Sequence, residues 1–181
     1  EQLVERFSRL DMLHQKFVQL LSDEAVDLGR DINLLRVLNM KTSARNQFVG
    51  TVTAIKTGAV NDEIQLTLPG GASIVAIITR ESTESLGLQI GNAVFALIKA
   101  SSIIVAADMD NAKLSASNQL PGTVAAVMPG AVNAEVVIDI DGGGSIAAIV
   151  TQSSAESLGL QVGNRATAIF KASSVILGVN V

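Results

Sequence analysis

The sequence predicts a mainly β protein in which two small five-stranded barrels follow one another, preceded by a short helical segment. Two observations carry this prediction. Residues 43–105 align without a gap onto residues 115–177, and 35 of the 63 paired positions are identical. Within each copy, short apolar runs rich in Val and Ile are separated by turns that contain glycine, a pattern typical of compact sheets.

The composition narrows the class of protein. Of the 181 residues, 48% are hydrophobic and 17% are charged, which allows a buried core and argues against disorder. The absence of cysteine excludes disulfides and thiolate metal sites and favours a cytoplasmic location. The apolar runs are shorter than the roughly 18 residues that a membrane span needs. The net charge of −4 gives no basic footprint for nucleic acid, so any anion site must be local.

Residues 1–41 differ in pattern from the rest and predict a helical segment. Over about 3–21, six mostly apolar residues recur at alternating spacings of four and three and form the seam of a heptad pattern. Charged or amide residues fill most of the opposite face, as in an amphipathic helix. A second short helix is expected over 32–39. A lone helix needs a partner surface, so we expect 1–41 to serve as a dimerisation and linker segment. The seam residues are Leu3, Phe7, Leu10, His14, Phe17 and Leu21.

The first repeat is expected to hold five short strands, over 50–55, 63–68, 73–78, 93–98 and 103–106. Pro69-Gly70-Gly71 predicts a tight hairpin turn between the second strand and the third. Thr79 is placed to cap one short helix that Gly87 ends. The second repeat copies this order after a linker at 107–114. Five strands and one helical turn in about 65 residues predict a small barrel of the oligonucleotide/oligosaccharide-binding type.

Ser43 and Arg45 open the first repeat and are the first candidates for ligand binding. A guanidinium offers planar, fixed donors and a hydroxyl adds another, which suits an oxyanion. The alternative is a solvated arginine at a domain junction. The second repeat has Ser117 in place of Arg45, whereas an arginine needed for barrel stability would be expected in both copies. This difference favours a binding role.

Two further segments supply hydrogen-bond donors. Thr79 and Ser82 lie at the start of the predicted short helix, where unpaired backbone amides attract anions, although a capping role explains the same residues. Lys99 and Ala100 follow the fourth strand and offer an ammonium group and a backbone amide. A lysine at this point also protects a strand edge from aggregation. Lys171 repeats the pattern in the second copy, and both interpretations remain open.

Together these segments offer cations, hydroxyls and backbone amides, but no carboxylate. Such a set suits a fully ionised tetrahedral dianion, which only accepts hydrogen bonds. It suits phosphate less well, because the protonated oxygen of phosphate needs an acceptor. The sequence contains no paired carboxylates in a pKa-shifting setting and no Walker-type loop. We therefore expect a binding protein with no catalytic residues and no metal-ion site.

Several segments resemble the Mop (molbindin) domain, which binds molybdate. They lie at 42–47, 58–63, 86–88 and 99–104, with matches at 130–135 and 157–160 in the second copy. The resemblance implies a first Mop domain at 42–107 and a second at 114–181. Residues 1–41 are similar to the helical segment before the Mop pair in ModE-type molybdate-responsive transcriptional regulators. The winged helix-turn-helix domain of that family is expected to be absent here.

The resemblance implies a homodimer that binds molybdate or tungstate at its subunit interface and needs no organic cofactor. Ligand binding would alter the dimer geometry and strengthen binding of operator DNA by an upstream domain. One subunit would contribute Ser43 and Arg45. The other would contribute Thr79, Ser82, Lys99 and the backbone of Ala100.

A second, weaker site is also implied, formed by Thr151, Ser154 and Lys171. The chain departs from the family at 99–102, where it has Lys-Ala-Ser-Ser instead of the frequent Lys-Ala-Pro-Trp. Two alternatives to the regulator stay open: a molybdate storage or buffering protein, and the regulatory tail of a molybdate import ATPase. An upstream helix-turn-helix would identify the regulator, and a Walker motif the ATPase.

Overall fold

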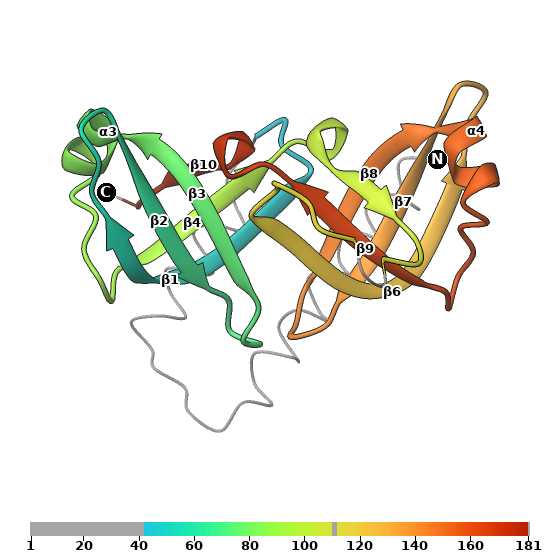
Figure 1. Ribbon diagram of the computed structural model, residues 1–181, viewed down its shortest axis with the longest axis horizontal. Helices are drawn as coiled ribbons and strands as arrows, with labels where there is room; N and C mark the ends of the chain where they lie inside the picture. The colour runs from blue at the N-terminus through green and yellow to red at the C-terminus, as the bar shows by residue number, and fades with distance from the viewer. Residues whose placement is uncertain (1–41, 110–111, 181) are drawn as a thin grey trace, which may run out of the picture. The chain divides into compact units, whose positions relative to one another are not determined.

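The structure is a computed structural model that describes residues 42–109 and 112–180. These residues belong to one compact unit, Val37–Val181. They form two five-stranded sheets with two short α-helices and two 3₁₀ turns, so the predicted mainly β fold class is confirmed (Figure 1). The helices predicted over 3–21 and 32–39 lie outside the described residues. Within 42–109 and 112–180, no helix is long and apolar enough to cross a membrane.

The strands lie close to the predicted positions. The first repeat contains β1 (Asn46–Lys56), β2 (Asn61–Thr67), β3 (Ser73–Thr79), α3 (Arg80–Ser85), β4 (Ala93–Ile98), η1 (Ala100–Ser102) and β5 (Ile104–Ala106). The second contains β6 (Asn118–Pro129), β7 (Asn133–Ile140), β8 (Ser145–Thr151), α4 (Gln152–Ser157), β9 (Arg165–Phe170), η2 (Ala172–Ser174) and β10 (Ile176–Gly178). The first strand begins four residues earlier than expected, and the two 3₁₀ turns were not predicted.

Each sheet takes its fifth strand from the other repeat. The strand order is β10-β4-β1-β2-β3 in the first sheet and β5-β9-β6-β7-β8 in the second (Figure 1). The expectation that each copy would supply all five strands of its own barrel is therefore wrong. The 3₁₀ turn η1 follows β4 and packs against β8 of the second repeat. The chain therefore leaves the first sheet at η1, and β5 joins the second sheet.

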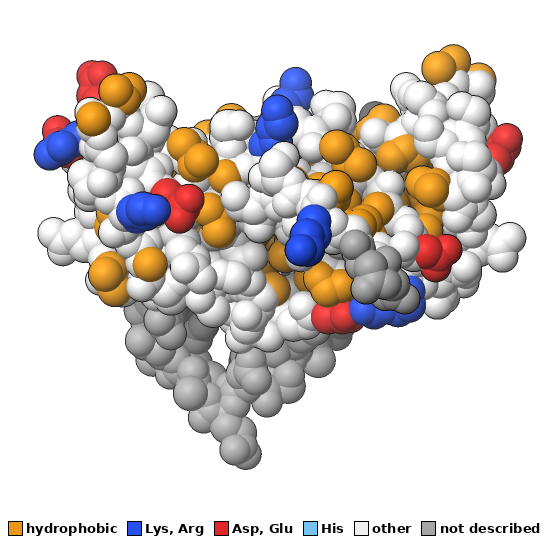
Figure 2. Space-filling view, viewed as in Figure 1, with side chains coloured by type: hydrophobic (Ala, Val, Ile, Leu, Met, Phe, Trp, Pro, Cys, Tyr) orange, Lys and Arg blue, Asp and Glu red, His pale blue; other side chains and the backbone are white. Residues whose placement is uncertain are grey.

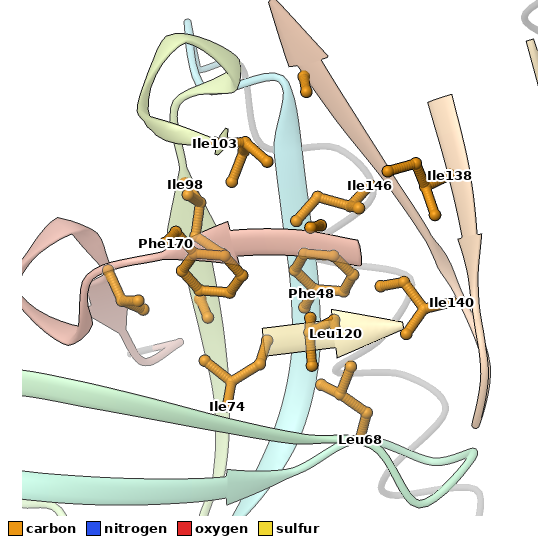
Figure 3. Packing of buried hydrophobic residues seen from close by; sticks show 14 of the residues in the cluster. Phe48, Leu68, Ile74, Ile98, Ile103, Leu120, Ile138, Ile140, Ile146 and Phe170 are labelled. Carbon is orange, nitrogen blue, oxygen red and sulfur yellow. The ribbon is translucent and has the colours of Figure 1, made fainter. Parts of the chain in front are cut away.

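The two repeats share one hydrophobic core. In β2 and β7, buried side chains alternate with more exposed ones, as expected for strands that cover a core on one face. Phe48 and Ile74 from the first repeat belong to the same buried cluster as Leu120, Ile146 and Phe170 from the second (Figure 3). Because one cluster joins both sheets, neither repeat buries its apolar face alone.

Equivalent asparagines fasten each repeat to the other. The Asn46 amide donates to the Ala147 carbonyl oxygen (2.9 Å) and accepts from the Ala147 amide (2.7 Å). Asn118, 72 positions later, makes the same two bonds with Val75, both at 2.8 Å. Both asparagines are buried, at 3% and 1% exposure. Such reciprocal contacts between equivalent residues indicate an approximate twofold relation between the repeats.

The predicted hairpin turns meet at the same approximate twofold. Gly70 in the first repeat and Gly142 in the second are equivalent positions, and a Cβ added to Gly70 would overlap the Gly142 carbonyl group. The Ala72 amide donates to that carbonyl oxygen at 3.4 Å. Glycine is therefore required at position 70 because two backbones approach each other there.

Candidate functional site

Arg45 and Lys99 lie at the same end of the first sheet. β1 and β4 are antiparallel, and Asn46 pairs with Ile98. Arg45, which precedes β1, therefore lies beside Lys99, which follows β4. The resemblance assigned these two residues to different subunits, but the strand register brings them together within one chain. Both side chains are exposed.

The Arg45 guanidinium already has a carboxylate partner. Its Nη2 donates to Oε1 of Glu135 in β7 at 2.7 Å, and the two side chains are 54% and 20% exposed. The sequence suggested a site with donors only, so this carboxylate from the other repeat was missed. One signal was available. The register pairs Glu63 with Lys56 in the first sheet, whereas the equivalent Glu135 pairs with Met128 and so lacks a cation across the strand.

Each Lys-Ala-Ser-Ser segment packs against the other repeat. η1 directly follows Lys99 and contacts β8, which ends at Thr151, whereas η2 directly follows Lys171 and contacts β3, which ends at Thr79. One chain therefore groups Lys99 with the strand that carries Thr151. The grouping of Lys99 with Thr79, as implied by the resemblance, is not made by these contacts within a single chain.

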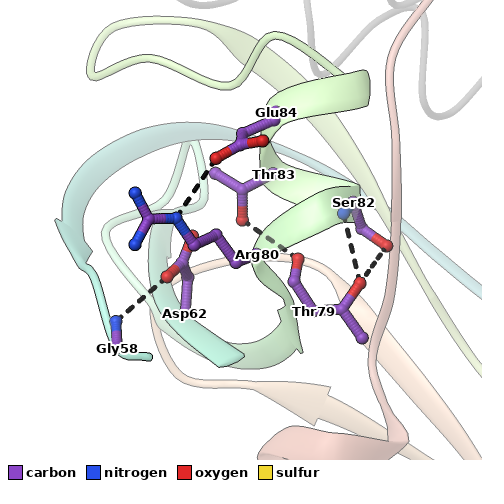
Figure 4. A network of polar contacts seen from close by, with 7 residues as sticks. All are labelled: Gly58, Asp62, Thr79, Arg80, Ser82, Thr83 and Glu84. Atoms are coloured by element: carbon purple, nitrogen blue, oxygen red, sulfur yellow. Dashed lines mark hydrogen bonds and ion pairs between the residues drawn. The ribbon is translucent and has the colours of Figure 1, made fainter. Parts of the chain in front are cut away.

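Thr79 and Ser82 form the N-terminal cap of α3 (Figure 4). The Thr79 hydroxyl oxygen accepts from the Ser82 amide at 3.1 Å and lies 2.7 Å from the Ser82 hydroxyl. Thr83 donates to the Thr79 carbonyl oxygen at 3.4 Å. The predicted cap at Thr79 is therefore confirmed. The two hydroxyls keep their remaining hydrogen-bonding capacity, because a hydroxyl can both donate and accept.

The second repeat reproduces this cap at the start of α4. Thr151 accepts from the Ser154 amide at 3.1 Å, and the two hydroxyls are 2.6 Å apart. The carbonyl oxygens of Lys99 and Lys171 accept from the amides of Ser102 (2.9 Å) and Ser174 (3.0 Å), but among the described residues the two ammonium groups have no ion-pair partner. Ser43 is exposed. The two ammonium groups thus remain available to a ligand, whereas the cap amides of Ser82 and Ser154 are already bonded to Thr79 and Thr151.

Charges elsewhere in the described part of the chain do not build a second kind of site. On the face drawn in Figure 2, lysine and arginine side chains lie apart from one another, and several are next to acidic ones. Within 42–109 and 112–180, no group of three His, Asp or Glu residues could hold a metal ion. Arg165 forms an ion pair with Asp141, and this hydrogen bond lowers the pKa of Asp141 and raises that of Arg165. Both side chains are exposed and lie in the second repeat.

The comparisons with known proteins agree with this architecture. The molybdenum-pterin-binding protein MopA of Rhodobacter capsulatus is 48% identical over 148 residues, which cover 82% of this chain and 56% of MopA. The molybdenum transport protein ModE of Azotobacter vinelandii is 41% identical over 182 residues, which cover 98% of this chain and 67% of ModE. The chain thus spans about half to two thirds of the length of these relatives.

A solved structure is also similar to this chain. The cytoplasmic molybdate-binding protein ModG, in a crystal form with molybdate bound, matches with 48% sequence identity and a TM-score of 0.76. The match covers 78% of this chain and all of the ModG chain. The TOBE domain family matches residues 42–105 and again residues 114–177, the same two segments that form the repeats. The chain therefore belongs to the TOBE domain family and carries two copies of this domain in tandem.

Proposed function

We propose that this chain binds molybdate, with Arg45 as the main counter-charge of the ligand. The observation that carries the proposal is the match to ModG, which extends over the whole of that molybdate-bound protein at 48% identity. Molybdate is a tetrahedral dianion that accepts hydrogen bonds and donates none. The free donors at the end of the first sheet suit it for this reason. Tungstate has the same shape and charge and is expected to bind as well.

The proposed site combines two groups of residues that one chain keeps apart. Arg45 and Lys99 share one end of the first sheet, and the segment after Lys99 packs against β8. Thr79 and Ser82 lie at the end of β3, which packs against the other 3₁₀ turn. A second copy of the chain can bring its own Thr79 and Ser82 to this Arg45. We therefore propose a homodimer with the ligand at its interface.

In this arrangement the site residues are Ser43, Arg45, Lys99 and the Ala100 backbone of one subunit with Thr79 and Ser82 of the other. Thr151, Ser154 and Lys171 form the proposed second site. That site is expected to be weaker, because Ser117 stands in the place of the arginine. The guanidinium and ammonium groups offset the two negative charges, while the hydroxyls and amides fix the four oxygens.

The regulator is the favoured biological role. ModE of Azotobacter vinelandii aligns over 98% of this chain, a share too large for the tandem repeats alone, so residues before 42 take part in the match. Binding would then shift the dimer geometry and act on operator DNA through a domain outside this sequence. A storage or buffering role is the second candidate, supported by the 48% identity to ModG over its full length. In either role we propose a cytoplasmic location, as stated for ModG.

The test is a calorimetric titration with molybdate, read together with the mass of the dimer. Wild-type protein is expected to bind molybdate and to bind sulfate much more weakly, since sulfate is smaller than molybdate and would lie loosely among donors that suit the larger ion. The Arg45→Ala variant is expected to lose at least about tenfold in affinity, or about 1.4 kcal/mol, because a dianion loses a charged donor. Arg165→Ala is the matched control, an exposed arginine in an ion pair of the second repeat. Equal Kd values for wild type and Arg45→Ala would contradict the site.

A further inference from the structure

We propose that Glu135 competes with the bound oxyanion for Arg45 and thereby sets the affinity of the site. The inference rests on the proposed function and adds a residue to which the resemblance gives no role in binding and which the set of donors does not include. In the structure, the Arg45 Nη2 group donates to Oε1 of Glu135 at 2.7 Å. A ligand that takes up the guanidinium therefore has to displace, or share the donors with, a carboxylate that is already present.

The surroundings of the pair make this competition unequal. The Glu135 side chain is only 20% exposed, whereas the Arg45 side chain is 54% exposed and can turn towards solvent. Oε1 receives one bond from Arg45, so the contact lacks the two parallel bonds of a strong arginine–carboxylate pair. The pair is thus weak enough to open. The carboxylate stays close after it opens because its strand is part of the sheet.

A comparison of the two repeats explains why Glu135 pairs with Arg45. Glutamate occupies the equivalent position in both copies, at 63 and 135. In the first sheet Lys56 lies directly opposite Glu63, but in the second sheet the uncharged Met128 lies opposite Glu135. Arg45 supplies the positive charge that is missing from the position opposite Glu135. The arginine is therefore shared between a structural partner and the ligand.

The effect of Glu135 on a dianion has a definite sign. Its negative charge lies one hydrogen bond away from the guanidinium, so a ligand bound to the same guanidinium is repelled by it. Charges in such partly exposed positions still interact, and the interaction is screened by salt. Removal of the charge is expected to tighten molybdate binding, roughly threefold to tenfold at low salt. The gain is expected to shrink as salt is added.

The experiment compares Glu135→Gln with Glu63→Gln in calorimetric titrations with molybdate. Glutamine keeps the length of the side chain and an oxygen that can accept from Arg45, so the substitution removes the charge and retains the geometry. Glu135→Gln is expected to lower the Kd roughly threefold to tenfold. Glu63→Gln removes the same charge from the equivalent position of the other sheet, away from Arg45, and is expected to change the Kd less than about twofold.

Three outcomes would overturn the proposal. An unchanged Kd for Glu135→Gln would show that the carboxylate does not compete. A higher Kd, with a further rise in Glu135→Ala, would show that Glu135 instead orients Arg45 for the ligand. An equal decrease in Kd for Glu63→Gln would show that the net charge of the protein, and not the contact with Arg45, sets the affinity. If wild-type protein bound no molybdate, the proposed function would fail, and that result is distinct from wild-type binding that Glu135→Gln leaves unchanged.

Discussion

Asn46 and Asn118 show how much a single residue type can contribute to this fold. Both copies of the repeat have asparagine here, and nothing in the sequence alone singles it out from its neighbours. In the structure each asparagine side chain makes the two hydrogen bonds that the backbone of a neighbouring strand would make. It donates to the carbonyl oxygen and accepts from the amide of one residue in the opposite repeat. The amide group is suited to this task because it carries one acceptor and two donors on a planar unit.

Asn46→Ala is expected to destabilise the whole chain. The substitution leaves the amide and the carbonyl of Ala147 without their partner in a buried position, and each unsatisfied group costs about 1–3 kcal/mol. We expect a loss of about 2–4 kcal/mol in the free energy of unfolding, measured by urea denaturation followed by circular dichroism. Asn118→Ala should cost a similar amount, since the contact is reciprocal. Asn133→Ala, at an exposed position, is the control; a loss for Asn46→Ala as small as that of the control would contradict the role.

The ion pair between Asp141 and Arg165 predicts a pH dependence. The pKa of Asp141 is lowered in the folded chain, chiefly by the hydrogen bond from Arg165. The pair therefore contributes stability above the unfolded pKa of about 3.9, and the contribution is lost as the pH falls through the lower folded pKa. Asp141→Asn is expected to lower the melting temperature at pH 7 but not at a pH below both values. Asp139→Asn is the control, and a deficit for Asp141→Asn that persists at the lowest pH would argue against the pair.

At the scale of the elements, the sequence predicted where strands lie better than it predicted which strands pair. Sequence patterns are local: alternation of apolar and polar residues located β2 to within two residues, and a short apolar run located β4. Strand partners are set by contacts between residues that are far apart in the chain. β5 and β10 end the two repeats with similar sequences, Ile-Val-Ala and Ile-Leu-Gly. Nothing in these local sequences shows whether each strand joins the sheet of its own repeat or that of the other repeat.

The structure contains one feature that does distinguish them. In the first sheet Gly178 of β10 lies opposite Phe95 of β4, and a Cβ added to Gly178 would overlap the phenyl ring. In the second sheet the equivalent pair is Ala106 opposite Thr167. If β5 stayed with its own repeat, the Ala106 methyl group would meet the Phe95 ring. Phe95 therefore favours the exchanged strand, which ends in glycine.

Gly178→Ala tests this steric match. We expect a loss of about 1–3 kcal/mol in the free energy of unfolding, because the added methyl group must displace the ring of Phe95. The double variant with Phe95→Thr recreates the pair found in the second sheet and is expected to cost less than the sum of the two single variants, with a coupling of at least about 0.5 kcal/mol. Strictly additive losses would mean that the two residues do not interact.

The candidate site shows the same division between local and distant information. Arg45, Thr79 and Lys99 could be named from the sequence, because each belongs to a short segment with its own donor chemistry. Glu135 could not be named with them, since it reaches Arg45 only through the packing of one repeat against the other. The difference between Lys56 and Met128 was the single hint, and its meaning depends on a strand register that the sequence does not show.

At the scale of the whole molecule, the exchanged strands and the shared core predict that the two repeats unfold together. Ile138 of β7 is fully buried in the cluster that also contains Phe48 of the first repeat (Figure 3). Ile138→Ala is expected to cost about 2–5 kcal/mol through the cavity it leaves. If unfolding is cooperative, amide hydrogen exchange should accelerate equally in β2 and β7 under conditions where exchange reports global opening. Val132→Ala, at an exposed position of the same repeat, should change neither strand. Faster exchange confined to β7 would mean that the second sheet opens alone, and the strand exchange would then link two folding units instead of making one.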